Sequence, residues 1–289
     1  MNKYLKLMRI DNYLKNIIVL LPLLFSGRLF EDGKFAYALL AMLMFCLISS
    51  AVYVMNDLAD AKTDRINPAK CHRPIASGAI PVRNAFILLA ILVIVPLTVS
   101  LLVFKPLSAA CIGVYFVINI FYSLGLKNVM VVDVALIVSG FVIRVFYGTI
   151  VTDIDISPWF YVLIASIVTY TTVGKRLNEK KHLDGDPAMR PVLRNISVPQ
   201  LSVCMYLALL TMNVIFIIWI MDIIPVCETN PLWVIPIMIV FSWKCFVIVE
   251  NNQSDKDPFS LFVRDKVWIA SLLTLIVSII VTFYVEVAI

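Results

Sequence analysis

The chain has 289 residues, of which 61% are hydrophobic and only 15% are charged, and its mean hydropathy is +0.94. Soluble domains carry about a quarter charged residues, so this composition excludes an ordinary water-soluble fold. The formal net charge of +5 does not indicate a nucleic-acid binder, because no basic segment is interleaved with aromatic residues in a soluble domain. The composition predicts an all-α, polytopic membrane protein.

Runs of about 17 to 25 apolar residues are candidate membrane-spanning helices. Nine runs are predicted, near residues 14–31, 36–56, 84–104, 106–124, 130–151, 158–174, 198–223, 231–249 and 267–288. The first run is interrupted by Pro22 and closed by Gly27 and Arg28. Residues 1–15 are basic and amphipathic without a small-residue cleavage site, so no cleavable signal peptide is expected. We predict a nine-transmembrane-helix bundle that forms one domain over residues 1–289.

Lys and Arg residues are distributed unevenly between the two sides of these spans. Most of the 24 lie in the N-terminal segment, in the connections 57–83 and 175–197, and around the connection after the eighth span. By the positive-inside rule these segments are cytoplasmic, which places the N-terminus inside a cell membrane and the C-terminus outside. Polar chemistry on one face favours an enzyme with a cytosolic substrate, because transporters more often place polar residues near the membrane midplane.

The stretch Asn56-Asp57-x-x-Asp60-x-x-x-Asp64 directly follows the second apolar run. Positions 0, 1, 4 and 8 fall within one broad face of an α-helix. Mg²⁺ is usually bound by one or two carboxylates and completes its coordination with water and substrate phosphates. The alternative is a solvated helix end, but ionisable residues at the bilayer edge are costly and functional by default. We predict that these four residues form a catalytic Mg²⁺ site for a diphosphate.

A basic segment rich in turn-forming residues follows the acids. Its Arg65, Lys70 and Arg73 can neutralise phosphate oxygens, and the guanidinium group does so with two parallel hydrogen bonds. The same charges also serve the positive-inside rule, and both roles are compatible. Arg73, in the run Arg-Pro-Ile-Ala-Ser-Gly, is expected to be functional.

Arg144 is the single cation inside a predicted span, and Asp133 lies about three turns earlier on the same helix face. An unpaired guanidinium in lipid is costly, so Arg144 should face a cavity and contact either a protein carboxylate or a substrate phosphate. Before the first span, Arg9, Lys15 and Asn16 are expected at the membrane surface, in contact with a substrate phosphate or with lipid headgroups.

These segments together resemble a known family. The stretch Asn56–Asp64 and its continuation to Gly78 look like the first motif of the UbiA-type intramembrane prenyltransferases. Three further segments resemble one branch, the polyprenyl-phosphate (decaprenyl-phosphate) phosphoribosyltransferases: Met8-Arg9…Leu14-Lys15-Asn16, Tyr122-Ser123…Leu126-Lys127…Asp133 with Gly140-Phe141…Arg144…Gly148, and Gly174-Lys175-Arg176…Glu179. The resemblance covers nearly the whole chain.

That resemblance implies a helix bundle around a central cavity open to cytosol and lipid, Mg²⁺ as cofactor, and an apolar tunnel for a polyprenyl chain. The connections 57–83 and 175–197 would lie over the active site. The substrate-binding residues would be Arg73, Lys70, Arg65, Lys175, Arg176, Glu179, Asp133, Arg144, Lys15, Asn16, Lys127 and Tyr122.

The second motif departs from the general pattern of the family. Ordinary members carry an Asp-x-x-x-Asp-like motif after the sixth span, whereas this chain has Lys175-Arg176-Leu-Asn-Glu179-Lys-Lys-His. A basic segment suits a substrate with an extra phosphate, such as the 5-phosphate of phosphoribosyl pyrophosphate. It suits poorly a second metal that faces an uncharged aromatic acceptor. The alternative is again that Lys175 and Arg176 only set the membrane orientation.

The expected reaction is Mg²⁺-dependent transfer of 5-phosphoribose from phosphoribosyl pyrophosphate to a polyprenyl phosphate in the membrane, with release of pyrophosphate. The acceptor phosphate is already anionic, so no strong base is required of a chain with two histidines. Two alternatives stay open: an aromatic prenyltransferase that makes a quinone or haem precursor, and an ion or lipid transporter that uses the acids as an ion site. The oligomeric state and the isoprenoid length are not predicted.

Overall fold

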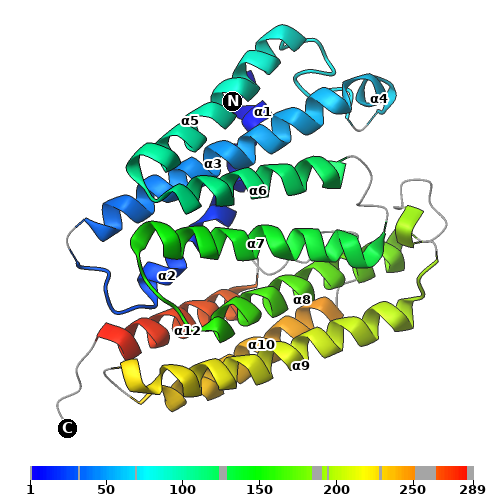
Figure 1. The fold of residues 1–289 in the computed structure, drawn as a ribbon. Helices are drawn as coiled ribbons and strands as arrows, with labels where there is room; N and C mark the ends of the chain where they lie inside the picture. The colour runs from blue at the N-terminus through cyan, green and yellow to red at the C-terminus, as the bar shows by residue number, and fades with distance from the viewer. Residues whose placement is uncertain are drawn as a thin grey trace. The chain divides into compact units, whose positions relative to one another are not determined.

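The computed structural model describes residues 2–31, 33–68, 70–123, 129–183, 191–193, 195–227, 230–250 and 265–284. Within these ranges the secondary structure is entirely helical (Figure 1). The long helices are α3 Lys34–Ala59, α5 Val82–Val103, α6 Pro106–Ser123, α7 Met130–Thr152, α8 Pro158–Leu183, α9 Val198–Ile223, α10 Ile235–Glu250 and α12 Lys266–Tyr284. The all-α prediction is confirmed for the described part of the chain.

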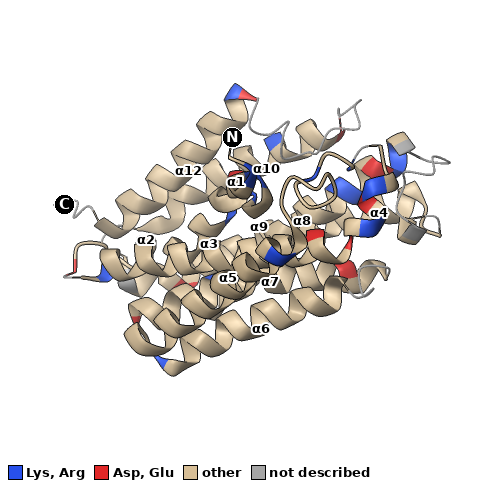
Figure 2. Ribbon diagram, turned by 90° about the horizontal axis from the view of Figure 1, so that it is seen from above, with Lys and Arg blue, Asp and Glu red and all other residues tan. Residues whose placement is uncertain are grey.

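Short helices complete the chain. They are α1 Lys3–Met8, the 3₁₀ helix η1 Ile10–Leu20, α2 Leu21–Leu24, α4 Ala61–Ile66, and the 3₁₀ segments η3 Pro191–Leu193, η4 Ile224–Val226 and η5 Pro231–Val234. Figure 2 shows that charged residues are sparse along the long helices and that several of both signs gather around α4. This pattern is expected of helices whose outer faces contact lipid.

Seven helices of the described chain are long and apolar enough to cross a membrane. They are Lys34–Ala59, Val82–Val103, Pro106–Ser123, Met130–Thr152, Val198–Ile223, Pro231–Glu250 and Lys266–Tyr284, and each corresponds to a predicted span. The run 14–31 is instead divided between η1 and α2. The run 158–174 lies inside α8, where helix-forming polar residues continue the helix to Leu183. These two spans remain predictions.

The extension of α8 also changes the expected connection 175–197. Its first part is helical rather than a loop, because Lys, Arg, Leu, Asn and Glu follow one another without a Pro or Gly before residue 185. The connection 57–83 is likewise partly helical, since α3 continues to Ala59 and α4 follows.

The chain divides into two compact units. Unit 1 comprises Met1–Leu23, Arg28–Gly125 and Ile143–Asp155, and unit 2 comprises Leu24–Gly27, Leu126–Val142 and Ile156–Ile289. Helix α7 therefore contributes its first part to unit 2 and its last part to unit 1.

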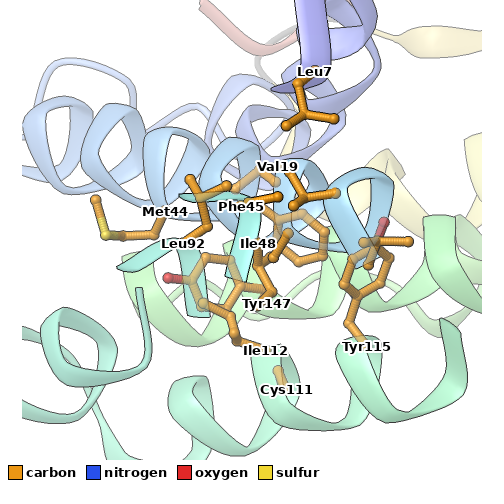
Figure 3. Packing of buried hydrophobic residues seen from close by; sticks show 14 of the residues in the cluster. Leu7, Val19, Met44, Phe45, Ile48, Leu92, Cys111, Ile112, Tyr115 and Tyr147 are labelled. Atoms are coloured by element: carbon orange, nitrogen blue, oxygen red, sulfur yellow. The ribbon is translucent and has the colours of Figure 1, made fainter. Parts of the chain in front are cut away.

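Unit 1 is organised around α3, which is the most buried of the seven candidate spans and packs against α1, η1, α5 and α6. Figure 3 shows side chains from these helices and from α7 meeting in one apolar cluster. The Phe45 ring lies 4.8 Å from that of Tyr115 and 5.5 Å from that of Tyr147, measured between centroids. The Tyr147 hydroxyl is paired with Ser100 at 2.9 Å, so this buried polar group is satisfied.

In unit 2, α8 packs along α9, and α10 packs against α12. An aromatic cluster of Phe25, Phe160 and Trp219 lies near the ends of α8 and α9, with ring centroids 5.3 to 6.1 Å apart. Ser197 begins α9 with a capping box, in which its hydroxyl and the Gln200 side chain each accept a hydrogen bond from the other residue's backbone.

Gly148 marks a close approach of two helices in unit 1. A Cβ atom at this position would lie 2.2 Å from the backbone carbonyl oxygen of Val19 in η1. No side chain fits there unless the backbones move apart. Gly113, in α6, has nothing within 4 Å of the same hypothetical atom.

We therefore expect Gly148→Ala to lower the stability of the detergent-purified protein by roughly 1–3 kcal/mol, the cost of overpacking. Gly113→Ala should be neutral or slightly stabilising, because Ala is the better helix former. Thermal unfolding of both variants against the wild type measures this difference. Equal unfolding temperatures would show that η1 and α7 are not in close contact.

Candidate active site

The acidic motif lies where α3 passes into α4. Helix α3 ends at Ala59, and Asp60 connects it to α4, which begins at Ala61. The backbone N–H of Asp60 donates to the carbonyl of Asn56 and that of Asp64 donates to the carbonyl of Asp60, both at 2.9 Å. Helical bonding thus continues almost unbroken through the motif, which places Asp57 and Asp64 two turns apart on one face. Both carboxylates are buried, whereas Asp60 is half-buried.

Arg73 bridges the two buried carboxylates. Its Nη1 lies 3.2 Å from Asp57 Oδ1 and 2.7 Å from Asp64 Oδ2. The sequence predicted Arg73 as a phosphate ligand, and the structure places it directly among the acids. Two carboxylates this close repel each other unless a cation lies between them, and the guanidinium supplies that charge.

The turn that follows holds Arg73 in place. Pro74, Ile75 and Ile80 are buried, and the backbone N–H of Ile80 donates to the carbonyl of Pro74 at 2.9 Å. Gly78 has φ +76°, a left-handed conformation that favours glycine, and allows the chain to reverse. The Lys3 ammonium also donates to the Ala79 carbonyl at 2.9 Å, which ties the turn to α1. The burial of these apolar side chains therefore fixes the position of Arg73.

Arg65 and Lys70 differ from Arg73 in being exposed. The structure brings neither into the described ion pairs of Asp57 and Asp64. Their predicted phosphate contacts remain predictions.

Arg9 has partners that the sequence does not predict. Its Nη2 lies 2.8 Å from Asp57 Oδ1, and its guanidinium lies over the Tyr53 ring, 4.8 Å from the centroid. The expected contact of Arg9 at the membrane surface remains a prediction. Arg9 ends α1 in a left-handed conformation with φ 51°, which is uncommon for a residue with a side chain. Its position in the Met8-Arg9 motif is the signal in the sequence that indicates a role.

Asn56 contacts Ser123, the last residue of α6. The Ser123 hydroxyl donates to Asn56 Oδ1, so the amide oxygen predicted as a metal ligand has a protein partner. The neighbouring Tyr122 is half-buried. Lys127, predicted to bind substrate, lies outside the described residues.

A second buried polar cluster surrounds Arg144 in unit 1. Its Nε donates to Asn16 Oδ1 at 2.8 Å, and its Nη2 donates to the Tyr115 hydroxyl at 3.0 Å and to Ser49 Oγ at 3.4 Å. The guanidinium lies 4.9 Å from the ring centroids of both Phe45 and Tyr115. These partners are neutral oxygens and aromatic faces, which stabilise the positive charge.

Asn16 therefore lies inside the helix packing and not at the membrane surface. Its side chain is 1% exposed and also donates to Cys46 Sγ at 3.2 Å. Lys15, the preceding residue, is exposed. A contact at the membrane surface was expected for both residues. It agrees with the exposure of Lys15 but not with the burial of Asn16.

Unit 2 contains a buried ion pair between α7 and α8. Arg176 Nε and Nη2 lie 2.9 and 2.8 Å from Asp133 Oδ2, and Arg176 Nη1 lies 3.5 Å from Glu179 Oε2. Asp133 is 0% exposed and Arg176 is 2% exposed, whereas Lys175 is exposed. The sequence predicts phosphate and ribose contacts for Arg176, Asp133 and Glu179, and the structure shows that Arg176 pairs with both carboxylates.

This ion pair yields a stability prediction. Asp133→Asn removes the charge opposite a buried guanidinium, and breaking a buried pair in this way costs roughly 3–5 kcal/mol. Asp222→Asn, at an exposed position near the end of α9, is the matched control. The double variant Asp133→Asn/Arg176→Gln should lose less stability than the sum of the two single losses in thermal unfolding. If Asp133→Asn unfolds at the same temperature as Asp222→Asn, the pair contributes nothing to stability.

Known proteins show which family this chain resembles. The profile of the UbiA prenyltransferase family matches residues 17–272. The chain belongs to the UbiA prenyltransferase family. Within it, the chain is 34% identical over 178 residues to decaprenyl-phosphate phosphoribosyltransferase of Corynebacterium glutamicum, a match that covers 61% of this chain and 54% of the relative. The protein of the same name from Mycolicibacterium smegmatis is 34% identical over 179 residues, covering 61% and 56% of the two chains.

The fold has a solved counterpart. The structure of a UbiA homologue from Archaeoglobus fulgidus bound to DMAPP and Mg²⁺ superimposes with a TM-score of 0.73, at 15% identity, over 96% of this chain and 99% of that one. At this identity the likeness concerns the fold alone. The matches to the two bacterial phosphoribosyltransferases span little more than half the length of those relatives.

The residues of this UbiA-family chain fit a Mg²⁺ site that a substrate completes. Among the described residues, no three His, Cys, Asp or Glu side chains lie together so as to hold a metal ion by themselves. The structure does bring together two buried carboxylates, those of Asp57 and Asp64, through their shared contact with Arg73. Carboxylate oxygens suit a hard cation, and one or two of them with substrate phosphates are the usual Mg²⁺ ligand set.

Proposed function

We propose that this chain is a Mg²⁺-dependent membrane transferase that moves 5-phosphoribose from phosphoribosyl pyrophosphate to a polyprenyl phosphate and releases pyrophosphate. The observation that carries this proposal is the likeness to two phosphoribosyltransferases over 61% of the chain. The basic composition of the segment from Lys175 to Lys181 supports it, because it departs from the acidic second motif that the resemblance to ordinary prenyltransferases implies.

The buried acids and arginines of unit 1 supply the chemistry that such a transfer needs. In the reaction an oxygen of the lipid phosphate forms a bond to the anomeric carbon of the ribose, while the bond from that carbon to pyrophosphate breaks and its electron pair leaves with pyrophosphate. The negative charge that develops on the leaving group must be stabilised. Mg²⁺, held by Asp57 and Asp64 with Asp60 and Asn56 nearby, would neutralise that charge.

Arg73 would bind a leaving-group oxygen, since it already lies between the two carboxylates. The phosphate contacts of Lys175 and Arg176, and the ribose contacts of Asp133 or Glu179, remain predictions from the sequence. In the structure Arg176 is paired with Asp133 and Glu179. No protein base is needed, because a phosphate monoester with a second pKa of about 6 is mostly dianionic near neutral pH. Both histidines, His72 and His182, are exposed, which agrees with a mechanism that does not use them.

The membrane arrangement belongs to the same proposal. We place nine spans in the cell membrane, with the N-terminus and the acidic motif on the cytoplasmic side and the C-terminus outside. Seven apolar helices and the excess of Lys and Arg near α4 and at the end of α8 support this orientation. A cytoplasmic site suits a water-soluble phosphosugar donor and a lipid acceptor that arrives within the bilayer.

The assay measures transfer of radiolabelled phosphoribose to polyprenyl phosphate by the full chain in detergent. Activity should require Mg²⁺ and should be lost on addition of EDTA and restored by excess Mg²⁺. Asp57→Asn should reduce the rate about 10² to 10³-fold, the usual cost of removing one charge-stabilising group. Asp11→Asn, which changes an exposed acid, is the control.

Two results would contradict the proposal. An inactive wild-type protein that prenylates an aromatic acid efficiently would make the chain a prenyltransferase of the more general kind. Full activity of Asp57→Asn would instead exclude the acidic motif as the metal site.

A further inference from the structure

We propose that Arg9 has a guard role at the metal site, which means that its guanidinium pairs with Asp57 until a diphosphate binds. A divalent cation and the diphosphate then bind together, whereas the cation alone binds weakly. This inference rests on the proposed role of Asp57 and Asp64 in binding Mg²⁺. It assigns to Arg9 a function in setting the order and coupling of ligand binding.

The charges around Asp57 support this role. Two guanidinium groups, those of Arg9 and Arg73, lie 2.7 to 3.2 Å from two carboxylates, so the four side chains are formally neutral together. Both carboxylates are almost completely buried, with side-chain exposures of 3% and 4%. A dication added to a buried and already neutral cluster would leave two uncompensated charges, which is strongly unfavourable. A diphosphate brings the negative charge that removes this penalty.

The two arginines differ in how they are held. Arg73 bridges both carboxylates and is fixed by the buried turn that contains Ile75. Arg9 contacts one carboxylate oxygen, on Asp57, and its side chain is 33% exposed against 24% for Arg73. Rotation of Arg9 away from Asp57 therefore breaks one ion pair and moves the guanidinium toward solvent. Moving from a carboxylate to a phosphate oxygen therefore costs less free energy for Arg9 than for Arg73.

The backbone explains why Arg9 is available at this position. Helix α1 ends at Met8, Arg9 caps it with φ 51°, and η1 begins at Ile10. This left-handed conformation is unfavourable for a residue with a side chain, and such strain persists where surrounding contacts maintain it. The ion pair with Asp57 and the stacking on Tyr53 are two such contacts. The strained corner thus directs the Arg9 guanidinium to the Asp57 carboxylate.

The test measures metal binding separately from catalysis. Mn²⁺ replaces Mg²⁺ as a paramagnetic probe, and its binding to the full chain in detergent is followed by electron paramagnetic resonance, with and without pyrophosphate. For the wild type we expect weak Mn²⁺ binding that pyrophosphate strengthens at least tenfold, within the usual 5- to 150-fold range of coupling between ligands. Arg9→Gln should bind Mn²⁺ alone about tenfold more tightly and should lose most of the enhancement by pyrophosphate.

Three further variants complete the experiment. Arg83→Gln removes the same charge from an exposed position at the start of α5 and should leave Mn²⁺ affinity unchanged. Arg9→Lys keeps the charge and should remain close to the wild type, which also shows that position 9 tolerates substitution. Asp57→Asn should abolish Mn²⁺ binding under both conditions.

The outcomes separate this inference from the proposed function. If Arg9→Gln binds Mn²⁺ alone no more tightly than the wild type, while pyrophosphate still enhances binding, the guard role is wrong and the metal site stands. If Arg83→Gln strengthens binding as much as Arg9→Gln, the effect is general electrostatics and the guard role is equally wrong. If no protein binds Mn²⁺ with pyrophosphate present, or Asp57→Asn binds it normally, both the inference and the proposed metal site are overturned.

Discussion

Charged side chains that leave water must be neutralised by partners inside the protein, and this constraint determines the arrangement of the polar residues in this chain. The buried carboxylates of Asp57, Asp64 and Asp133 each lie within 3 Å of a guanidinium nitrogen. Arg144 is buried as well, and neutral oxygens and two aromatic rings surround it. In an apolar protein the cost of a charge without such partners is several kcal/mol. Each of these buried charges therefore requires charged, polar or aromatic partners in the packed interior.

The same constraint connects the structure to the chemistry of a transferase. A cluster that is neutral by itself has little affinity for either a cation or an anion alone, but it can exchange its internal partners for a metal ion and a diphosphate together. The acids and arginines of unit 1 have this composition. In the proposed function, this composition would keep the site from holding a bare metal ion and would still allow it to neutralise a leaving pyrophosphate.

Rigid packing holds these groups in place. Helix α3 is the most buried candidate span, and it ends in the acidic motif. The close approach at Gly148 fixes η1 against α7 in unit 1, and η1 follows directly after Arg9. Helix α7 takes part in both units, since Asp133 belongs to unit 2 and Arg144 to unit 1. Sites built on such packed helices retain their geometry better than sites on free loops.

Several features follow from the sequence by itself. Apolar length predicts nine spans, and seven of them correspond to helices that are long and apolar enough to cross a membrane. The spacing of Asp57 and Asp64 places them on one helical face. Both patterns depend only on local geometry. The tertiary structure decided the partners. Asp133 and Arg144 share a helix, yet Asp133 pairs with Arg176 and Arg144 with Asn16, and Arg9 reaches Asp57 across 48 positions of sequence. Such contacts depend on how helices pack, and one sequence carries no local signal for that packing.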